Sequence, residues 1–288
     1  MTGPHTSAPD CPLFLEGTFR FDENGYRFAS EPPLDLMSSA AVSSSDHWIA
    51  LAAALQHAKA GNHEHVSRLL ARVKRDTAPG LVLAVTALVG DAGSEMDVEG
   101  LIDLMDESQP DYTRVVACKA AAHSGYIWLA PGILECWRTI TPRERGEIEL
   151  SLKILLEREV TEITGSFRFE EDIGYFEFVS ERISEIFSKY GDKTIWHALP
   201  IHARRVVSEM AQILHEESMD VAAELFAPCR HRLEAMTGMD CSSFYDRRTG
   251  RLRLLHVAAR LQELLASGTL DGLVDGERYF FGHLVPNT

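Results

Sequence analysis

Histidines are the residues in this sequence best suited to metal binding, but their spacing does not fit a metal site. His63 and His65 are two positions apart, so on a helix they would point roughly 200° away from each other. Helices that bind metals place their ligands three or four residues apart. His197 and His202 are five residues apart with Pro200 between them, which is again poor geometry. We therefore expect no metal and no cofactor, and interpret His63 and His65 as exposed polar residues in a first helical turn.

The best candidate for nucleophilic catalysis is the pair Cys118 and His123. The two residues are five positions apart on one predicted helix, so they face different sides, and Cys118 lies among alanines and valines. A small buried core residue is the better interpretation of such a cysteine. The sequence contains no phosphate-binding loop, dinucleotide fingerprint or G-x-S-x-G elbow. We therefore predict no catalytic residues and a protein that is not an enzyme.

A run of acidic residues is the most distinctive chemical feature. No lysine or arginine occurs between Asp76 and Thr113. Like charges four residues apart on a helix repel by about 0.2–0.5 kcal/mol, so a ladder of them is favoured by something other than helix stability. We predict a surface for a basic protein partner, formed by Asp91, Glu95, Asp97, Glu99, Asp103, Asp106, Glu107 and Asp111. The alternative is a solvated face that keeps the protein soluble.

The charge balance points to the same class of partner. The 288 residues include 28 basic and 43 acidic ones, which gives a net charge of −15. Nucleic acids and anionic membrane surfaces would repel such a chain, so we expect neither as a partner. A basic protein is favoured because long-range attraction speeds the encounter. The C-terminal third is locally basic through Arg230, Arg232, Arg247, Arg248, Arg251, Arg253 and Arg260, which predicts a polarised molecule.

The compartment is predicted from the N-terminus, the apolar stretches and the cysteines. The first residues show neither a basic region nor an apolar core of a secretory signal. The longest apolar stretch, 81–89, is far shorter than the ~20 residues of a membrane span. Five scattered cysteines without C-x-x-C spacing are typical of free thiols in a reducing compartment. We expect a cytoplasmic protein.

Periodicity predicts a mainly all-α fold. After a flexible lead-in over 1–12, Asn24-Gly25 between alternating aromatic residues predicts a β-hairpin over 13–30. Two helical halves, 31–160 and 161–288, then form one continuous domain. The predicted helices cover 47–60, 62–75, 79–89, 95–107, 111–123, 131–137, 142–160, 172–190, 201–217, 221–236 and 252–266, and a strand is predicted over 279–285. In the helix over 95–107, the apolar stripe consists of Val98, Leu101, Ile102 and Met105.

Part of this pattern resembles a known repeat family. The residues concerned are Pro110-Asp111-Tyr112-Thr113-Arg114-Val115-Val116-Ala117, followed by Ala120, Ala121 and Gly125. This run resembles the second half of a HEAT-type repeat, which implies stacked antiparallel helix pairs. An irregular helical superstructure is the alternative. The segments 17–26 and 165–175 also resemble each other, which suggests a duplication.

In general make-up the chain is similar to the immunity proteins of bacterial polymorphic-toxin systems. The similarity lies in its acidity, its helical character and its lack of catalytic motifs, and it covers no diagnostic motif. It implies a protein that neutralises a basic toxin by covering its active site. Two alternatives remain open: a helical-repeat scaffold or regulator that binds a peptide or protein, and an all-α enzyme with an unrecognised site. The oligomeric state is not predicted.

Overall fold

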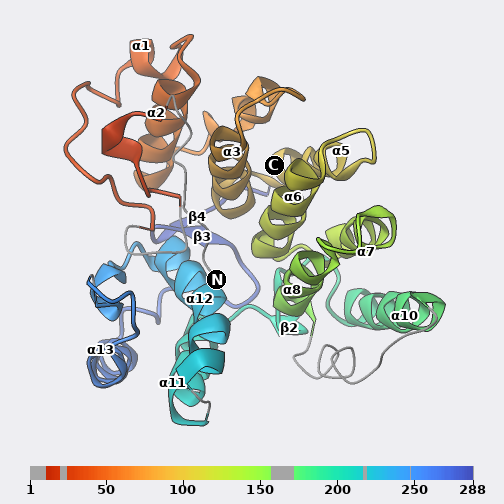
Figure 1. Ribbon diagram of the computed structural model, residues 1–288. Helices are drawn as coiled ribbons and strands as arrows, with labels where there is room; N and C mark the ends of the chain where they lie inside the picture. Colours follow the sequence, from red (N-terminus) through yellow and green to blue (C-terminus); the bar gives the residue numbers. More distant parts are fainter. Residues whose placement is uncertain (1–10, 20–24, 157–171, 217–218, 247, 288) are drawn as a thin grey trace. The chain divides into compact units, whose positions relative to one another are not determined.

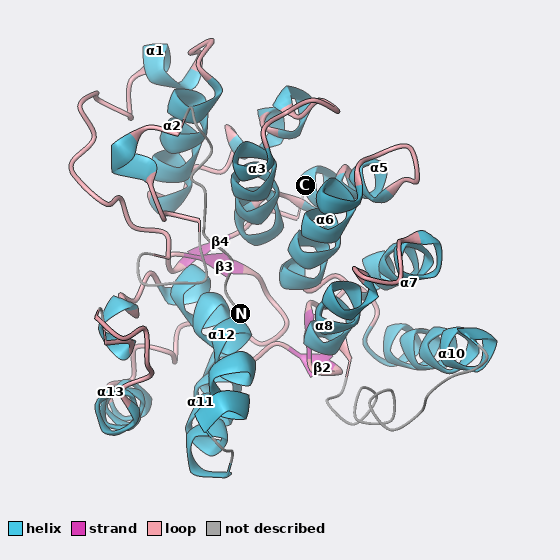
Figure 2. Ribbon diagram, in the orientation of Figure 1, coloured by secondary structure: helices cyan, strands magenta, loops and turns pink. Residues whose placement is uncertain are grey.

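The computed structural model describes residues 11–19, 25–156, 172–216, 219–246 and 248–287 (Figure 1). The chain is 59% helical, which confirms the prediction of a mainly helical fold. Its strands form two small antiparallel sheets of two strands each within the described residues (Figure 2). The chain forms two compact units, which are treated separately. Unit 1 comprises Met1–His65, His202–Asp275 and Tyr279–Val285, and unit 2 comprises Val66–Ile201, Gly276–Arg278 and Pro286–Thr288.

Unit 1 is built from the two ends of the chain. Its elements are η1 (Leu13–Leu15), α1 (Ser39–Val42), α2 (His47–Lys59), α11 (Ala203–Glu216), α12 (Met219–Thr237), η5 (Ser242–Phe244), α13 (Leu254–Ala266), β3 (Tyr279–Phe280) and β4 (His283–Leu284). Helix α2 begins as predicted, because the Asp46 carboxylate accepts hydrogen bonds from the Trp48 and Ile49 amides. It ends at Lys59, and Gly61 follows two residues later with a φ of 84°, a left-handed conformation that glycine adopts most readily. Helix α11 packs against both α12 and α13.

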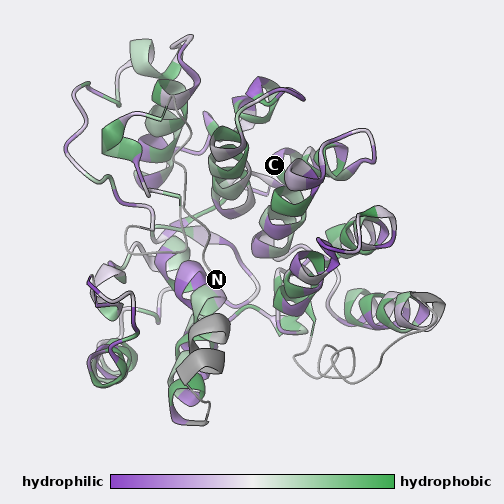
Figure 3. Ribbon diagram, viewed as in Figure 1, coloured by the Kyte–Doolittle hydropathy of each residue, from purple (hydrophilic) through white to green (hydrophobic). Residues whose placement is uncertain are grey.

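Unit 2 is built from the middle of the chain. Its elements are η2 (Val66–Arg68), η3 (Leu70–Arg72), α3 (Pro79–Ala92), α4 (Glu95–Glu99), α5 (Leu101–Met105), α6 (Asp111–Ser124), η4 (Ile127–Leu129), α7 (Ala130–Thr139), α8 (Arg145–Leu155), α10 (Asp172–Tyr190), β1 (Ile195–Trp196) and β2 (Leu199–Pro200). Much of α3 has the green colour of hydrophobic residues in Figure 3, and most of its side chains are buried. Helix α3 packs along α6 at close range, because a Cβ on Gly90 would lie 2.4 Å from the Ala120 carbonyl oxygen.

The predicted β-hairpin over 13–30 is wrong for the part of it that the structure describes. This part contains the 3-10 turn η1 and irregular backbone but no strand. The two arms still lie side by side, with the Phe14 and Phe28 ring centroids 5.8 Å apart. A single backbone hydrogen bond, from the Ala29 amide to the Phe14 carbonyl, joins them within this part, which is too few for a ladder. The strands occur instead at 195–200 and in the predicted tail, where 279–284 forms a hairpin.

The helix predicted over 62–75 is also wrong. The chain there forms the two short 3-10 turns η2 and η3. The buried side chains of this stretch are His63, Val66, Leu69 and Val73. The first three are spaced three residues apart, as on a 3-10 helix. His63 is therefore buried, at 6% exposed, and not an exposed polar residue.

The helix predicted over 95–107 is divided at Gly100 into the short helices α4 and α5. A Cβ on Gly100 would lie 2.8 Å from Leu70 Cδ1, so this glycine permits close packing at the break. The break changes which side chains are buried. Leu104 is buried, whereas Ile102, which was predicted in the apolar stripe, is 42% exposed.

Three other predictions stay predictions. The HEAT-like arrangement remains a prediction, and so does the division of the chain at residue 160. The second copy of the suggested duplication begins at 165, and residues 165–171 lie outside the described part of the chain.

Among the described helices, none combines the length and the apolar character needed to cross a membrane.

Candidate protein-binding surface

The eight predicted partner-binding residues all belong to unit 2, but they differ in exposure. Glu99, Asp103, Asp106 and Glu107 are exposed, Glu95, Asp97 and Asp111 are half-buried, and Asp91 is buried. Seven of them therefore reach the surface of the segment 95–112, which is called the acidic segment below. It contains α4, α5 and the start of α6.

Asp91 does not belong to this surface. It lies in the last turn of α3 and is 1% exposed. One of its carboxylate oxygens lies within 4.8 Å of a ring nitrogen of His123, which is itself 3% exposed. A carboxylate and an imidazole at this distance are groups that can ligate a metal. The expectation that no metal binds stays a prediction.

The half-buried acids help to fold the segment. Asp97 forms a capping box with Ser94, whose amide donates to the Asp97 carboxylate over 2.8 Å. Asp111 forms an ion pair with Arg114 at 3.5 Å. Because these two carboxylates already form contacts within the fold, they are weaker candidates for contacts with a partner than the exposed carboxylates are.

The exposed acids have few cationic neighbours. Glu99 and Asp103 form no ion pair with any described residue. Asp106 accepts a hydrogen bond from the Ser108 amide at 2.8 Å, and hydrogen bonding by Ser108 lowers the pKa of the Asp106 carboxyl. Glu107 lies near Arg138 and raises the pKa of that guanidinium slightly, after the larger effect of Glu135. The segment thus presents a negative field that the fold hardly neutralises.

Exposed apolar side chains lie among these acids. Met96 is 74% exposed, Ile102 is 42% exposed and Tyr112 is 43% exposed. The periodicity placed Ile102 in the helix core, and the break at Gly100 is the reason that it is not there. Exposed aromatic residues and methionine are enriched where protein interfaces form.

Arg114, in the first half of α6, holds the acidic segment to the rest of unit 2. The side chain is 3% exposed, and its Nε donates to the Met105 carbonyl over 3.0 Å. Its Nη2 donates to the Thr139 hydroxyl at the end of α7. The end of α5 is therefore fixed to two neighbouring helices, so the exposed acids are carried by a supported backbone.

The predicted basic character of the C-terminal third is only partly at the surface. Arg230 and Arg232 are each 1% exposed, so they do not belong to a basic surface. The Arg230 guanidinium carbon lies 5.2 Å from the centre of the Tyr245 ring, in a cation–π contact. The exposed arginines of this region are Arg248, Arg251, Arg253 and Arg260, and Arg247 lies outside the described residues.

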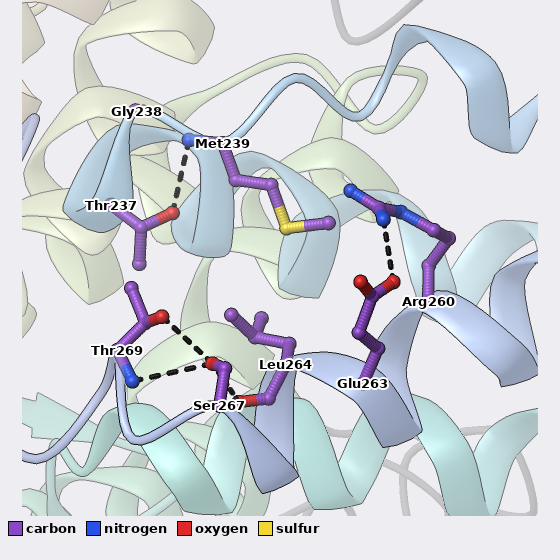
Figure 4. Close-up of a pocket in the computed structure, with 8 residues that line it drawn as sticks. All are labelled: Thr237, Gly238, Met239, Arg260, Glu263, Leu264, Ser267 and Thr269. Carbon is purple, nitrogen blue, oxygen red and sulfur yellow. Dashed lines mark hydrogen bonds and ion pairs between the residues drawn. The ribbon is translucent and has the colours of Figure 1, made fainter.

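Unit 1 contains a half-open pocket of about 280 Å³ between the end of α12 and the C-terminal half of α13 (Figure 4). Its lining residues are Thr237, Gly238, Met239, Arg260, Glu263, Leu264, Ser267 and Thr269. Arg260 is paired with Glu263 at 2.5 Å, and the Ser267 and Thr269 hydroxyls hydrogen bond to each other at 2.7 Å. These polar groups are paired with one another, so few of them are available to hydrogen bond or pair with a ligand.

The candidate nucleophile Cys118 is a core residue, as predicted. It is 0% exposed, and burial is the largest cause that raises the pKa of its thiol. A buried, protonated thiol is a poor nucleophile. All five cysteines are free thiols.

Arg278 is an important residue that sequence reasoning missed. It is 2% exposed and donates two hydrogen bonds, to the Gly93 carbonyl at 2.7 Å and the Gly90 carbonyl at 2.8 Å. Its guanidinium carbon lies 5.0 Å from the centre of the Tyr126 ring. The cation therefore caps the negative end of α3. A lone arginine between Glu277 and Tyr279 gave no sequence signal for this contact.

No protein-family model matches the sequence, and neither a curated protein nor a solved structure shows significant similarity to it.

Proposed function

We propose that the protein binds a basic protein partner through the acidic segment, and that it acts by binding rather than by catalysis. The observation that carries this proposal is the composition of the segment's surface. Glu99, Asp103, Asp106 and Glu107 are exposed together with Met96, Ile102 and Tyr112. Charge and exposed apolar area thus occur on the same short stretch of chain.

The two kinds of side chain have different roles in binding. Exposed carboxylates attract a cationic surface over several ångströms and raise the association rate, an effect that salt weakens. Apolar side chains that become buried on contact supply most of the affinity and slow dissociation. A solvated face that serves only solubility needs the first kind of side chain but not the second, so Met96, Ile102 and Tyr112 favour a binding surface.

The most concrete form of this function is that of an immunity protein that covers the active site of a basic toxin. The net charge of −15 and the helical fold suit such a role. The partner's surface would carry lysines and arginines around an apolar centre, because that arrangement complements the acidic segment.

Hydrogen–deuterium exchange tests the location of the surface. The probe is a synthetic helical peptide with lysines on one face and leucines beside them. We expect the peptide to protect amides within 95–112, and we expect 200 mM salt to weaken this protection. The α10 segment is the internal comparison, because it carries exposed acids at Glu177 and Glu181 together with the exposed Phe178 ring. Equal protection of α10, or none in 95–112 at a peptide concentration that saturates binding, would contradict the proposal.

A further inference from the structure

Lys59, the last residue of α2, is the only lysine of unit 1 and lies between two aromatic rings. Its Nζ is 4.7 Å from the centre of the Phe28 ring and 5.1 Å from the centre of the Phe281 ring. The side chain is half-buried, so the amino group has apolar walls but keeps a path to solvent. Such a setting removes water from the ammonium ion.

The charged groups that face Lys59 are Arg27 and Glu234. Burial is the main cause that lowers the pKa of Lys59, to about 8, and the positive charge of Arg27 lowers it further. Glu234 of α12 acts in the opposite direction. On the hairpin side, His283 packs against Gly61, two residues beyond the lysine. The attraction of the ring faces for an ammonium ion opposes its desolvation only in part.

The Phe281 ring is held in place by an unusual backbone. Phe281 has a φ of 50°, which is rare for a bulky residue, and it occupies the β3–β4 turn with Gly282 at 80°. The Phe281 amide donates to the Ala235 carbonyl over 2.7 Å, and the Gly282 amide donates to the Met236 carbonyl over 2.8 Å. These bonds fix the turn on the end of α12. Strain of this kind is often kept where a side chain must be positioned for function.

We infer that Lys59 is a selectively reactive amine, a modification site at which small carbonyl compounds, such as aldehydes and 2-oxo acids, form an imine. The Nζ lone pair attacks the carbonyl carbon, and a C–N bond forms as the carbonyl oxygen takes up a proton. The resulting carbinolamine loses its hydroxyl group as water while the nitrogen loses its protons. The products are the imine and one water molecule, and nothing is oxidised or reduced. Burial between Phe28 and Phe281 disfavours the ammonium form, so a larger share of the amine is neutral and able to react.

The expected selectivity follows from the amount of neutral amine. At pH 7.5, an amine with a pKa near 8 is neutral about two hundred times more often than an ordinary lysine with a pKa of about 10.4. A less basic amine is also a weaker nucleophile, which cancels part of this gain. We therefore expect Lys59 to react about tenfold faster than a lysine with an ordinary pKa.

Reductive alkylation of the intact protein tests the inference. Glyoxylate and cyanoborohydride convert each imine into a stable carboxymethyl group, which peptide mass spectrometry assigns to one of the six lysines. Lys153, half-buried on α8, is the matched comparison. We expect Lys59 to be modified about tenfold faster than Lys153 at pH 7.5, with a rate that levels off above pH 8. Modification of Lys59 no faster than Lys153 would overturn the inference.

Two variants separate reactivity from simple exposure. Arg27→Gln removes a neighbouring positive charge, so the pH at which the Lys59 rate is half-maximal should rise. Glu234→Gln removes a negative charge, so that pH should fall. Shifts in opposite directions require that both groups act on the amine. Shifts in the same direction, or no shift in a variant whose circular dichroism matches the wild type, would contradict the mechanism. The wild-type measurement decides the inference even if either variant fails to fold.

Discussion

The exposed acids of unit 2 and the buried charges of unit 1 are two opposite uses of ionisable residues. In the acidic segment, Glu99 and Asp103 form no ion pair with described residues. In unit 1, Glu234 is 2% exposed and faces Arg230, His231 and Arg27. Burial raises the pKa of Glu234 despite these cations.

The difference separates charges that act on the fold from charges that act on a partner. Buried charges are worth several kcal/mol because desolvation and pairing are both large, so their removal should change stability. Exposed charges contribute little to stability and much to long-range attraction. The predictions below test this division, from the largest expected effect to the smallest.

Arg278→Ala should destabilise the protein by about 2–5 kcal/mol, because the Gly90 and Gly93 carbonyls would lose their buried donor. Arg278→Lys lacks the forked geometry that reaches both oxygens, but it keeps the positive charge at the end of α3. It should therefore lose less stability than Arg278→Ala. Urea unfolding followed by circular dichroism measures both variants. A loss below about 0.5 kcal/mol for the alanine variant would show that this buried cation does not support the fold.

Gly25→Ala should lower the free energy of unfolding by about 1–3 kcal/mol. Gly25 has a φ of 51°, and a Cβ there would lie 1.9 Å from Glu234 Oε2, so the buried carboxylate would have to move. Gly250→Ala is the matched control in unit 1, because its φ is 65° but no atom lies within 4 Å of the added Cβ. Urea unfolding should show a larger loss for Gly25→Ala. Equal losses would mean that only backbone strain, and not contact with Glu234, matters.

Glu234→Gln should change how stability depends on pH. A carboxyl with a raised pKa binds its proton more tightly in the folded state, so its contribution to stability is lost as pH rises from about 4 through the raised pKa. The glutamine variant lacks this loss. Its free energy of unfolding relative to the wild type should therefore be more favourable at pH 8 than at pH 4.5. A relative stability that does not change between these pH values would contradict the raised pKa.

Reversing two exposed acids, Glu99→Lys with Asp103→Lys, should change the free energy of unfolding by less than about 0.5 kcal/mol. Both side chains are exposed and form no ion pair with a described residue, and exposed charges of this kind contribute little to stability. Thermal unfolding by circular dichroism checks this value. A loss above about 2 kcal/mol would show that the acids belong to the fold and not to a partner surface.

Most helices could be predicted from the sequence because their local signals agree. Asp46, Pro79 and Gly61 all act at helix ends as their residue types predict. The breaks at 62–75 and at Gly100 could not be predicted in this way. Both depend on packing between segments, such as the approach of Leu70 to Gly100, which no local pattern records.

The candidate site could be predicted in outline but not in detail. The charge run correctly marked a stretch with exposed acids, because such residues seldom enter a core. Asp91 and Ile102 were misplaced, the first because it lies on the buried side of α3 and the second because the helix breaks before it. Lys59 has no distinctive neighbours in sequence, and its aromatic walls come from residues 28 and 281.

The association rate constant with the cationic helical peptide, measured by stopped flow in 20 mM salt, tests the central claim most directly. The Glu99→Lys, Asp103→Lys variant is compared with Glu177→Lys, Glu181→Lys, which makes the same change in net charge on exposed positions of α10. If the acidic segment is the binding surface, the first variant should associate at least tenfold more slowly than the second. Equal rates for the two variants would show that only net charge matters, and would contradict a binding surface in the acidic segment.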